Sequence, residues 1–346
     1  MLRLFNRPTP IALALQGGGA HGAFTWGVLD RLLEDGRFPI AAISGTSAGA
    51  INAVALASGL LDGGNDGARA ALQRLWQAVG SQSKFEPYLL GSADNPSIAP
   101  VARAWMQWAR LWSPQQLNPL GLNPLRGVLA EQIDFERLRA NSPVQLFIAA
   151  THANTGRLRL FGNAEMSADA VLASACLPTL QPAVTIDGEP YWDGGYSANP
   201  ALFPLVRSGV ADLLIVWLSP LVYARTPVSA EEIRERALDF AFNATFLREA
   251  QMLAELSAGA RRSAWPFGRL ARLRTHLIDA HDALGKLAQE TRLIAHGPFL
   301  ESLRDSGRER AGLWLEAAAR HVGKVSSADL AALFAPPAGS IPCPAN

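Results

Sequence analysis

Residues 11–22 are Ile-Ala-Leu-Ala-Leu-Gln-Gly-Gly-Gly-Ala-His-Gly, and residues 40–49 are Ile-Ala-Ala-Ile-Ser-Gly-Thr-Ser-Ala-Gly. In each stretch a short apolar run leads directly into a glycine turn, and a helical pattern follows the turn. This order predicts a buried strand, a tight turn and a helix, twice in succession. Strands that alternate with helices form a mostly parallel sheet covered on both faces, so we expect an α/β fold.

The first turn has the spacing G-x-G-x-x-G, carried by Gly17, Gly19 and Gly22. Dinucleotide-binding folds use this spacing and need an acidic residue about 20 residues later, at the end of the second strand. That position here holds Ser-Gly-Thr at residues 44–46, and the nearest acid, Asp35, precedes the strand. The sequence therefore disfavours a nucleotide site and leaves a loop of backbone N–H donors for another anion.

The second turn has the spacing G-x-S-x-G, with Ser47 between Gly45 and Gly49. The serine follows an apolar strand and precedes a helix, which is the position of a nucleophile elbow. Backbone N–H donors and a helix N-terminus stabilise the oxyanion that forms when a serine attacks a carbonyl group. The two turns together predict an acyl-transfer site. The structural alternative is a glycine turn that only packs a helix against a strand.

A serine nucleophile needs a base, and the sequence offers two kinds. The order Ser47, Asp193 and then His276 or His281 matches that of a Ser–Asp–His triad. The elbow already follows the second strand, however, which is early for that fold, and no histidine lies in a turn whose local sequence demands a histidine. Asp193 is the better candidate, because it ends an apolar strand and two glycines follow it. An Asx turn without a catalytic role is the alternative for this aspartate.

These three motifs, in this order and spacing, resemble the patatin-like phospholipase family. They are residues 17–22 (Gly-Gly-Gly-Ala-His-Gly), residues 45–49 (Gly-Thr-Ser-Ala-Gly) and residues 193–195 (Asp-Gly-Gly). The stretch 173–178 and the pair Asn199-Pro200 also look like that family. The resemblance covers about residues 11–206, and three motifs together are far more specific than any one of them.

The resemblance implies a three-layer α/β/α sandwich with a central, mostly parallel sheet. It implies a Ser–Asp dyad without histidine, in which Ser47 is the nucleophile and Asp193 is the base. The implied oxyanion hole is Gly17, Gly18 and Gly19. The supporting motif positions are His21, Gly22, Gly45, Gly49, Gly194 and Gly195. The family often has arginine or lysine where His21 stands, and a neutral histidine would support the oxyanion loop less strongly at pH 7.

We expect a catalytic domain over residues 11–206, with an aromatic and proline-rich insert at about 85–124. The last core strand and a helical C-terminal region are expected over residues 207–335, and a flexible tail over residues 336–346. The Gly/Asp/Asn-rich stretch at residues 62–68 is expected to form a loop.

Two surfaces are candidates for a peripheral membrane contact. Trp105, Trp108 and Trp112 share one face of a helix in the insert, which is either a lid or interfacial helix or a face packed on the core. The second candidate is a basic cluster with two aromatic residues, formed by Arg261, Arg262, Trp265, Phe267, Arg269, Arg272 and Arg274. A solvated basic face is the alternative for this cluster.

Composition narrows the function further. The 346-residue chain has a net charge of +1, which gives no electrostatic reason to expect a nucleic-acid partner. Its two cysteines cannot form a disulfide framework, so we expect a reducing, cytoplasmic compartment. Residues 38–61 are uncharged but contain proline, glycines and polar residues, and a buried strand–turn–helix explains them better than a membrane span.

The sequence therefore predicts a serine acyl hydrolase that cleaves lipid carboxylic esters, of the phospholipase A or lysophospholipase type. The expected substrate is a lipid or lysolipid. No cofactor and no metal are expected, because no metal-ligand spacing occurs among the cysteines, histidines and acids. Two alternatives stay open: an acyltransferase that uses the same acyl-enzyme, and a non-catalytic lipid-binding module. The sequence indicates no particular protein partner.

Overall fold

The computed structural model describes residues 8–82, 86–109, 111–223, 225–262 and 268–334. Its centre is an eight-stranded sheet in the order β10-β9-β1-β2-β5-β8-β7, with β6 also paired to β5. The strands are β1 (Ile11–Leu15), β2 (Ile40–Thr46), β5 (Gln145–His152), β6 (Leu158–Phe161), β7 (Val184–Ile186), β8 (Glu189–Asp193), β9 (Asp212–Trp217) and β10 (Arg274–Asp279). The five strands from β10 to β5 are parallel, whereas β6, β7 and β8 pair antiparallel.

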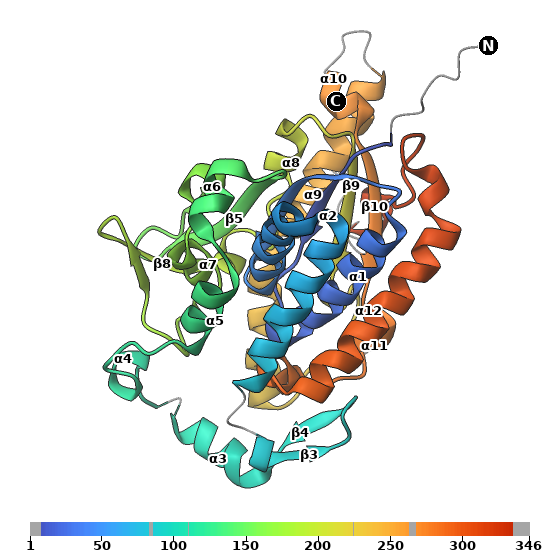
Figure 1. Cartoon of the computed structure of the whole chain (residues 1–346). Coiled ribbons are helices and arrows are strands. Elements are labelled where there is room, and N and C mark those ends of the chain that lie inside the picture. Colours follow the sequence, from blue (N-terminus) through green and yellow to red (C-terminus); the bar gives the residue numbers. More distant parts are fainter. Residues whose placement is uncertain (1–7, 83–85, 110, 224, 263–267, 335–346) are drawn as a thin grey trace, which may run out of the picture.

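Helices cover both faces of the sheet (Figure 1). One face carries α1 (Gly22–Asp35), α2 (Ala48–Ser81), α5 (Pro124–Gln132), α7 (Ala168–Ser174) and α12 (Gly297–Ala317), and the other carries α8 (Phe203–Arg207), α9 (Ala230–Arg262) and α13 (Leu330–Leu333). The other helices are α3 (Pro100–Ala109), α4 (Pro114–Leu117), α6 (Phe135–Asn141), α10 (Gly268–Arg272) and α11 (His281–Leu284). This arrangement confirms the predicted three-layer α/β sandwich with a mostly parallel sheet and C-terminal helices.

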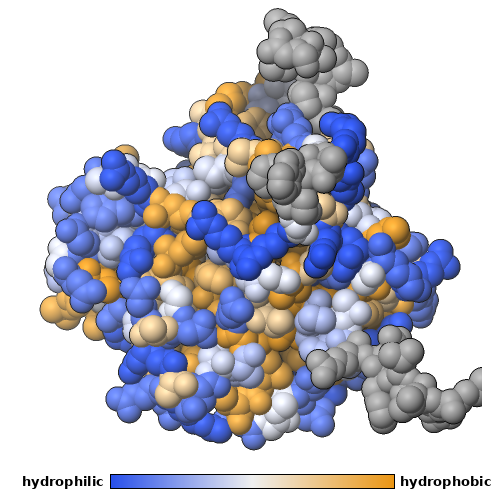
Figure 2. Space-filling view, turned by 90° about the horizontal axis from the view of Figure 1, so that it is seen from above, coloured by the Kyte–Doolittle hydropathy of each residue, from blue (hydrophilic) through white to orange (hydrophobic). Residues whose placement is uncertain are grey.

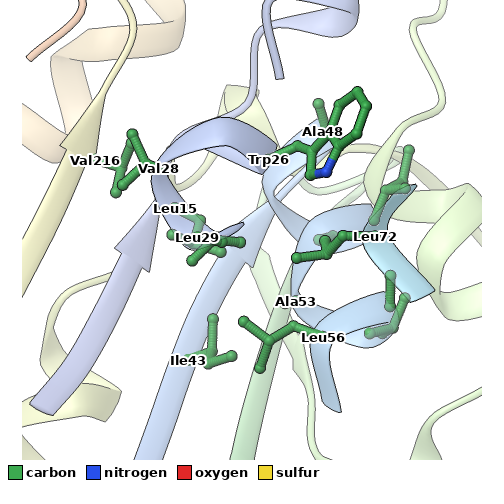
Figure 3. Close-up of a cluster of buried hydrophobic side chains, with 14 of the residues drawn as sticks. Leu15, Trp26, Val28, Leu29, Ile43, Ala48, Ala53, Leu56, Leu72 and Val216 are labelled. Carbon is green, nitrogen blue, oxygen red and sulfur yellow. The ribbon is translucent and has the colours of Figure 1, made fainter. Parts of the chain in front are cut away.

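The sheet separates two apolar cores. On the side of α1 and α2, Leu15, Ile43 and Val216 from three neighbouring strands meet Leu29 of α1 and Leu56 of α2 (Figure 3). The side chains of a strand alternate between the two faces, so the neighbouring residues Ala14, Ala42 and Trp217 enter the other core.

The second core lies between the sheet and α9. Trp217 of β9 and Phe246 of α9 are both buried, and their ring centroids lie 4.5 Å apart. Ala12 and Ala14 of β1 also enter this core, and their small side chains leave room for the aromatic pair. Two filled cores explain why β1 and β9 are buried along their whole length.

The predicted loop at residues 62–68 is reduced to a break of two residues, which divides α2 into two helical halves. Gly63 and Gly64 leave helical geometry, with φ of −166° and +61°, and the helix kinks there. Leu56 before the kink and Leu72 after it are both fully buried. Packing of both halves therefore outweighs the turn composition that the sequence shows.

Residues after 206 supply the expected last core strand and one further strand of the sheet. They supply β9 next to β1 and also β10, a second parallel strand at the sheet edge.

The predicted tail at residues 336–346 lies outside the described residues, as do Trp265 and Phe267 of the basic cluster. Hydrophilic and apolar residues are interspersed on the face of the molecule that is seen from above (Figure 2).

The uncharged stretch at residues 38–61 forms β2 and the first part of α2, as predicted. Over the residues that the structure describes, no helix is both long enough and apolar enough to span a bilayer.

The α1–α12 crossing depends on two glycines. A Cβ atom at Gly27 would lie 1.9 Å from the carbonyl oxygen of Arg304, and one at Gly307 would lie 2.1 Å from that of Phe24. The two backbones therefore touch at this crossing, which joins the C-terminal region to the first helix of the chain.

We expect Gly307→Ala to lower the free energy of unfolding by about 1–3 kcal/mol or more, because the added methyl group forces the two helices apart. Urea denaturation measures this change. Gly312→Ala on the same helix is the matched control, since a Cβ atom there meets nothing closer than 4.0 Å. Alanine favours an exposed helix over glycine by roughly 0.5–1 kcal/mol, so the control should be at least as stable as the wild type. Equal stability of the two variants would contradict the close crossing.

Candidate active site

The two glycine turns meet at one edge of the sheet. β1 and β2 are adjacent and parallel, with Leu15 opposite Gly45, so the turns that follow them lie side by side. A Cβ atom at Gly17 would lie 2.8 Å from the Cβ atom of Ser47. Glycine is therefore required at position 17 for the first loop to lie against the serine.

Ser47 lies in a strained turn between β2 and α2. Its φ of +53° and ψ of −120° fall outside the regions that side-chain-bearing residues usually adopt. A Cβ atom at Gly45 would lie 2.6 Å from the Gly49 carbonyl oxygen, and one at Gly49 would lie 2.1 Å from that of Leu15. Both glycines are thus sterically required, as a nucleophile elbow demands. The backbone N–H of Ser47 donates to Ser174 Oγ at 2.9 Å.

Asp193 ends β8 and begins the short 3-10 helix η4 (Gly194–Tyr196). Its side chain is buried, with 2% exposure, and its Oδ1 accepts the Gly195 N–H at 2.7 Å. Its own N–H donates to the Cys176 carbonyl oxygen at 2.8 Å, and its carbonyl oxygen accepts the Thr151 hydroxyl at 2.8 Å. The carboxylate therefore has a fixed position on a rigid strand end.

The two glycines after Asp193 are also sterically required. A Cβ atom at Gly194 would lie 2.2 Å from the Ala149 carbonyl oxygen, and one at Gly195 would lie 1.8 Å from the Phe242 ring of α9. Close packing against these two glycines fixes the turn that positions the Asp193 carboxylate.

Burial raises the pKa of Asp193 from 3.8 to about 7. The Gly195 N–H and the Ser47 hydroxyl act in the opposite direction, because each donates to the carboxylate and favours its ionised form. A carboxylate with this pKa is a much stronger base than an exposed aspartate.

The structure differs from the prediction at the oxyanion loop in one position. The N–H of Gly17 already donates to Asn199 Oδ1 at 2.8 Å. Among the described residues, no acceptor lies within bonding distance of the N–H groups of Gly18 and Gly19. The loop begins at Gln16, whose buried Oε1 accepts the Ser219 N–H at 3.0 Å. The loop is thus anchored at Gln16 and Gly17, directly before the two glycines that retain available donors.

A segment that the sequence did not indicate packs on this loop, namely the 3-10 helix η5 (Gln289–Leu293). Gly19 has a φ of +59°, and a Cβ atom there would lie 2.3 Å from the Arg292 carbonyl oxygen. His21 Nε2 lies 2.7 Å from Thr291 Oγ1, and the Thr291 hydroxyl donates to the Ala288 carbonyl oxygen at 2.6 Å. That hydroxyl has one proton, so His21 Nε2–H is the donor to Thr291.

His21 carries no charge in this position. Its side chain is 4% exposed, and burial together with the nearby Arg292 guanidinium lowers its pKa to about 3. His21 therefore supports the loop through a neutral hydrogen bond and supplies no cation, as the sequence led us to expect.

A buried carboxylate of α9 holds η5 in place. Asp239 is 2% exposed and accepts the Tyr223 hydroxyl at 2.7 Å. It also pairs with Arg292 and accepts a hydrogen bond from Gln289. Side chains of the C-terminal region thus position the glycine loop, although they lie more than 200 residues after it in the sequence. No spacing or motif in the sequence could have indicated this contact.

The site opens into a cavity of about 620 Å³, a size typical of small-molecule and lipid sites. Gly17–Gly19, Ser47 and Asp193 all line it. Most of the remaining wall is apolar and includes Ile51, Trp76, Val79, Met106, Leu177, Leu180, Phe242 and Leu293. This wall suits a hydrocarbon chain attached to a polar reacting group.

The structure does not bring a histidine to Ser47. His276 lies buried in β10, where it contacts Asp212 at 3.1 Å and Ser327 at 2.8 Å. In the sheet order, β9 and β1 separate β10 from β2. No histidine occurs among the described residues that line the cavity, and His281 is exposed at the start of α11. The Ser–Asp–His alternative is therefore wrong for these two histidines.

Burial of Asp193 predicts a pH-dependent stability. Because its pKa is higher in the folded than in the unfolded state, the free energy of unfolding falls as the pH rises from about 4 to about 7. Asp193→Asn removes this ionisation, so the variant should gain stability relative to the wild type between pH 4.5 and pH 8, by up to about 4 kcal/mol. Urea denaturation at both pH values gives the difference. A difference that does not change with pH would contradict the raised pKa.

Comparison with known proteins supports the assignment of this site to a family. The family described as "Patatin-like phospholipase" matches residues 13–206, which is more than half of the chain. No curated protein sequence matches the chain.

Two solved structures show partial likeness. VipD from Legionella pneumophila is 17% identical, with a TM-score of 0.43 over 90% of this chain and 67% of VipD. The ExoU–SpcU complex of the type III secretion system of Pseudomonas aeruginosa is 18% identical, with a TM-score of 0.34 over 92% of this chain and 52% of the matched chain. The family match, which includes all three motifs, decides the assignment. The chain belongs to the patatin-like phospholipase family and is an enzyme that hydrolyses lipid esters.

Proposed function

We propose that the chain is a serine acyl hydrolase of the phospholipase A or lysophospholipase type, acting through a Ser47–Asp193 dyad. The observation that carries the proposal is the Ser47 hydroxyl beside a buried Asp193 carboxylate, both on the wall of an apolar cavity. Residues 11–206 supply the reacting groups in this proposal, and residues 207–335 complete and support the site.

In the first half-reaction, Ser47 Oγ attacks the carbonyl carbon of a lipid ester, and its proton passes to the Asp193 carboxylate. The negative charge that develops on the carbonyl oxygen is stabilised by the N–H groups of Gly18 and Gly19. The C–O bond to the leaving alcohol then breaks, and Asp193 returns the proton to the departing oxygen. The products are a free alcohol or lysolipid and an acyl group esterified to Ser47.

In the second half-reaction, water attacks the acyl-enzyme. Asp193 accepts a proton from this water, and the same glycine N–H groups stabilise the second oxyanion. The bond to Ser47 Oγ breaks, Ser47 recovers its proton from Asp193, and a fatty acid leaves. The apolar cavity wall holds the hydrocarbon chain during both steps and limits the access of other water molecules.

Transfer of the acyl group to an alcohol instead of water remains the second candidate, because it uses the same intermediate. Addition of glycerol or a lysolipid during turnover distinguishes the two. The proposed hydrolase yields mainly free fatty acid, whereas an acyltransferase yields mainly transacylated product.

We expect Ser47→Ala and Asp193→Asn each to lower kcat on a p-nitrophenyl acyl ester by at least about 1000-fold, since each removes a member of the dyad. His281→Ala is the control, and it should leave the rate within twofold. A fluorophosphonate probe should label the wild type at Ser47 and fail to label Ser47→Ala. Full activity of Asp193→Asn would disprove the dyad, and a wild type that the probe does not label would favour the non-catalytic module.

We expect Gly19→Ala to lower kcat by about 100- to 1000-fold, the usual cost of one oxyanion donor. The new methyl group would displace the loop from Arg292, because the backbone of Gly19 has a positive φ and lies against that carbonyl oxygen. Gly156→Ala is the matched control, with a φ of +68° in the β5–β6 turn and nothing within 4 Å of the added Cβ atom. Steady-state kinetics on the same ester should show normal kcat for the control, and an equal loss in both variants would contradict the role of Gly19.

A further inference from the structure

Residues 89–122, here called the arm, project from the sandwich next to the active-site cavity (Figure 1). The arm contains the hairpin of β3 (Leu89–Gly91) and β4 (Pro96–Ile98), followed by α3, α4 and a turn. Arg103 of α3 attaches it to η5, because the guanidinium forms hydrogen bonds with Glu290 at 2.7 and 3.0 Å. The Ile98 N–H donates to the same carboxylate at 3.3 Å.

The two faces of α3 have different surroundings. Met106 and Ala109 line the cavity, and Ala102 one turn earlier is buried. Val101 and Trp108 lie on the other face, with 69% and 52% of their surface exposed. The sequence left open whether the tryptophan face packs on the core, and the structure shows that it does not.

The exposed face of α3 continues into an apolar surface along the arm. Its members are Val101, Trp105, Trp108, Leu111, Trp112, Leu117, Leu120 and Leu122, each between 45% and 81% exposed. Large exposed apolar surfaces of this kind mark sites of interaction, because water solvates them poorly. Trp105 and Leu117 belong both to this surface and to the cavity wall, so the surface is continuous with the active site.

The charges of the arm indicate which kind of partner its apolar surface binds. The arm contains two arginines, Arg103 and Arg110, and one acidic residue, Asp94 between β3 and β4, while the members of its exposed apolar surface carry no charge. An apolar surface without acidic residues meets no repulsion from negatively charged headgroups. Tryptophan is favoured at the boundary between headgroups and hydrocarbon, where its ring is apolar and its N–H is polar.

We infer that the arm docks on an anionic phospholipid surface and admits the ester from that surface into the cavity. The inference rests on the proposed lipid-ester hydrolysis, since such a substrate lies in an aggregate and must leave it to reach Ser47. Insertion of Trp108, Leu111 and Leu120 into the headgroup region brings the cavity entrance to the lipid. The substrate then enters along Trp105 and Leu117 without crossing bulk water.

The basic cluster near α10 is the weaker candidate for this contact. α10 and α3 lie at opposite ends of the molecule (Figure 1), so one flat membrane cannot touch both. Arg274 of that cluster forms an ion pair with buried Asp212, and Arg269 donates to the Arg207 carbonyl oxygen. Neither arginine lines the active-site cavity.

The test uses a triple variant, Trp108→Ser with Leu111→Ser and Leu120→Ser, in which none of the changed residues lines the cavity. The matched control changes three similarly exposed residues outside the arm, Leu256→Ser with Leu313→Ser and Val325→Ser. Binding is measured by co-sedimentation with phosphatidylcholine–phosphatidylglycerol vesicles, in a Ser47→Ala background that prevents turnover. Hydrolysis is measured on the same vesicles and on monomeric p-nitrophenyl butyrate.

We expect the arm variant to lose at least about tenfold in vesicle binding and in vesicle hydrolysis, and to hydrolyse p-nitrophenyl butyrate within twofold of the wild type. The control should match the wild type in all three assays. Equal vesicle binding by the arm variant and the wild type would overturn the docking role and leave the proposed hydrolysis intact. A wild type that hydrolyses neither substrate would overturn the proposed function, and vesicle binding would still test the surface.

The same test also identifies the other partner that could cover the apolar surface of the arm, which is a second copy of the chain. If light scattering shows that the wild type is a dimer and the arm variant a monomer, and neither binds vesicles, the arm is a dimer interface and the lipid inference is wrong.

Discussion

Close contact between the ends of β1 and β2 is the constraint on which the site depends. The two strands are parallel neighbours, so the chain leaves both at the same edge of the sheet and must turn twice in one small volume. Gly49 touches the Leu15 carbonyl oxygen and Gly17 touches Ser47, and neither contact leaves space for a Cβ atom. The backbone donors of the first turn therefore lie beside the hydroxyl of the second.

Asp193, the base of the proposed dyad, shows how burial changes the basicity of a carboxylate. Its side chain is 2% exposed, so it loses hydration and its pKa rises toward neutrality. An exposed aspartate would be ionised at pH 7 but would be a weak base. The same burial destabilises the folded state when Asp193 is ionised. The buried carboxylate is therefore a stronger base, but it lowers the free energy of unfolding.

The C-terminal region belongs to the site although it lies mostly outside the family match. β9 follows β1 in the sheet order, α9 supplies Asp239, and η5 packs on Gly19 and His21. Glu290 of η5 also holds the arm through Arg103. One short helix thus contacts both the oxyanion loop and the segment that we infer to dock on lipid. Neutral His21 has its hydrogen-bond partner in this helix, which explains how the loop is supported without a cation at that position.

The sequence by itself determined the strand–turn–helix order, the mostly parallel sheet and the three motifs, because each is a local pattern of apolar spacing and glycine placement. It favoured Asp193 over the histidines as the partner of Ser47 from its place at a strand end, and the resemblance to a family implied the dyad. It predicted an interruption at residues 62–68, but the packing of both halves of α2 confines the break to Gly63 and Gly64.

Only the tertiary structure decided the remaining features. It assigned the Gly17 N–H to Asn199, placed η5 on the glycine loop and exposed the tryptophans of α3. Each of these depends on contacts between residues far apart in the chain. Such contacts follow from the packing of complete elements, and a local sequence pattern does not record which distant backbone or side chain will fill the neighbouring space.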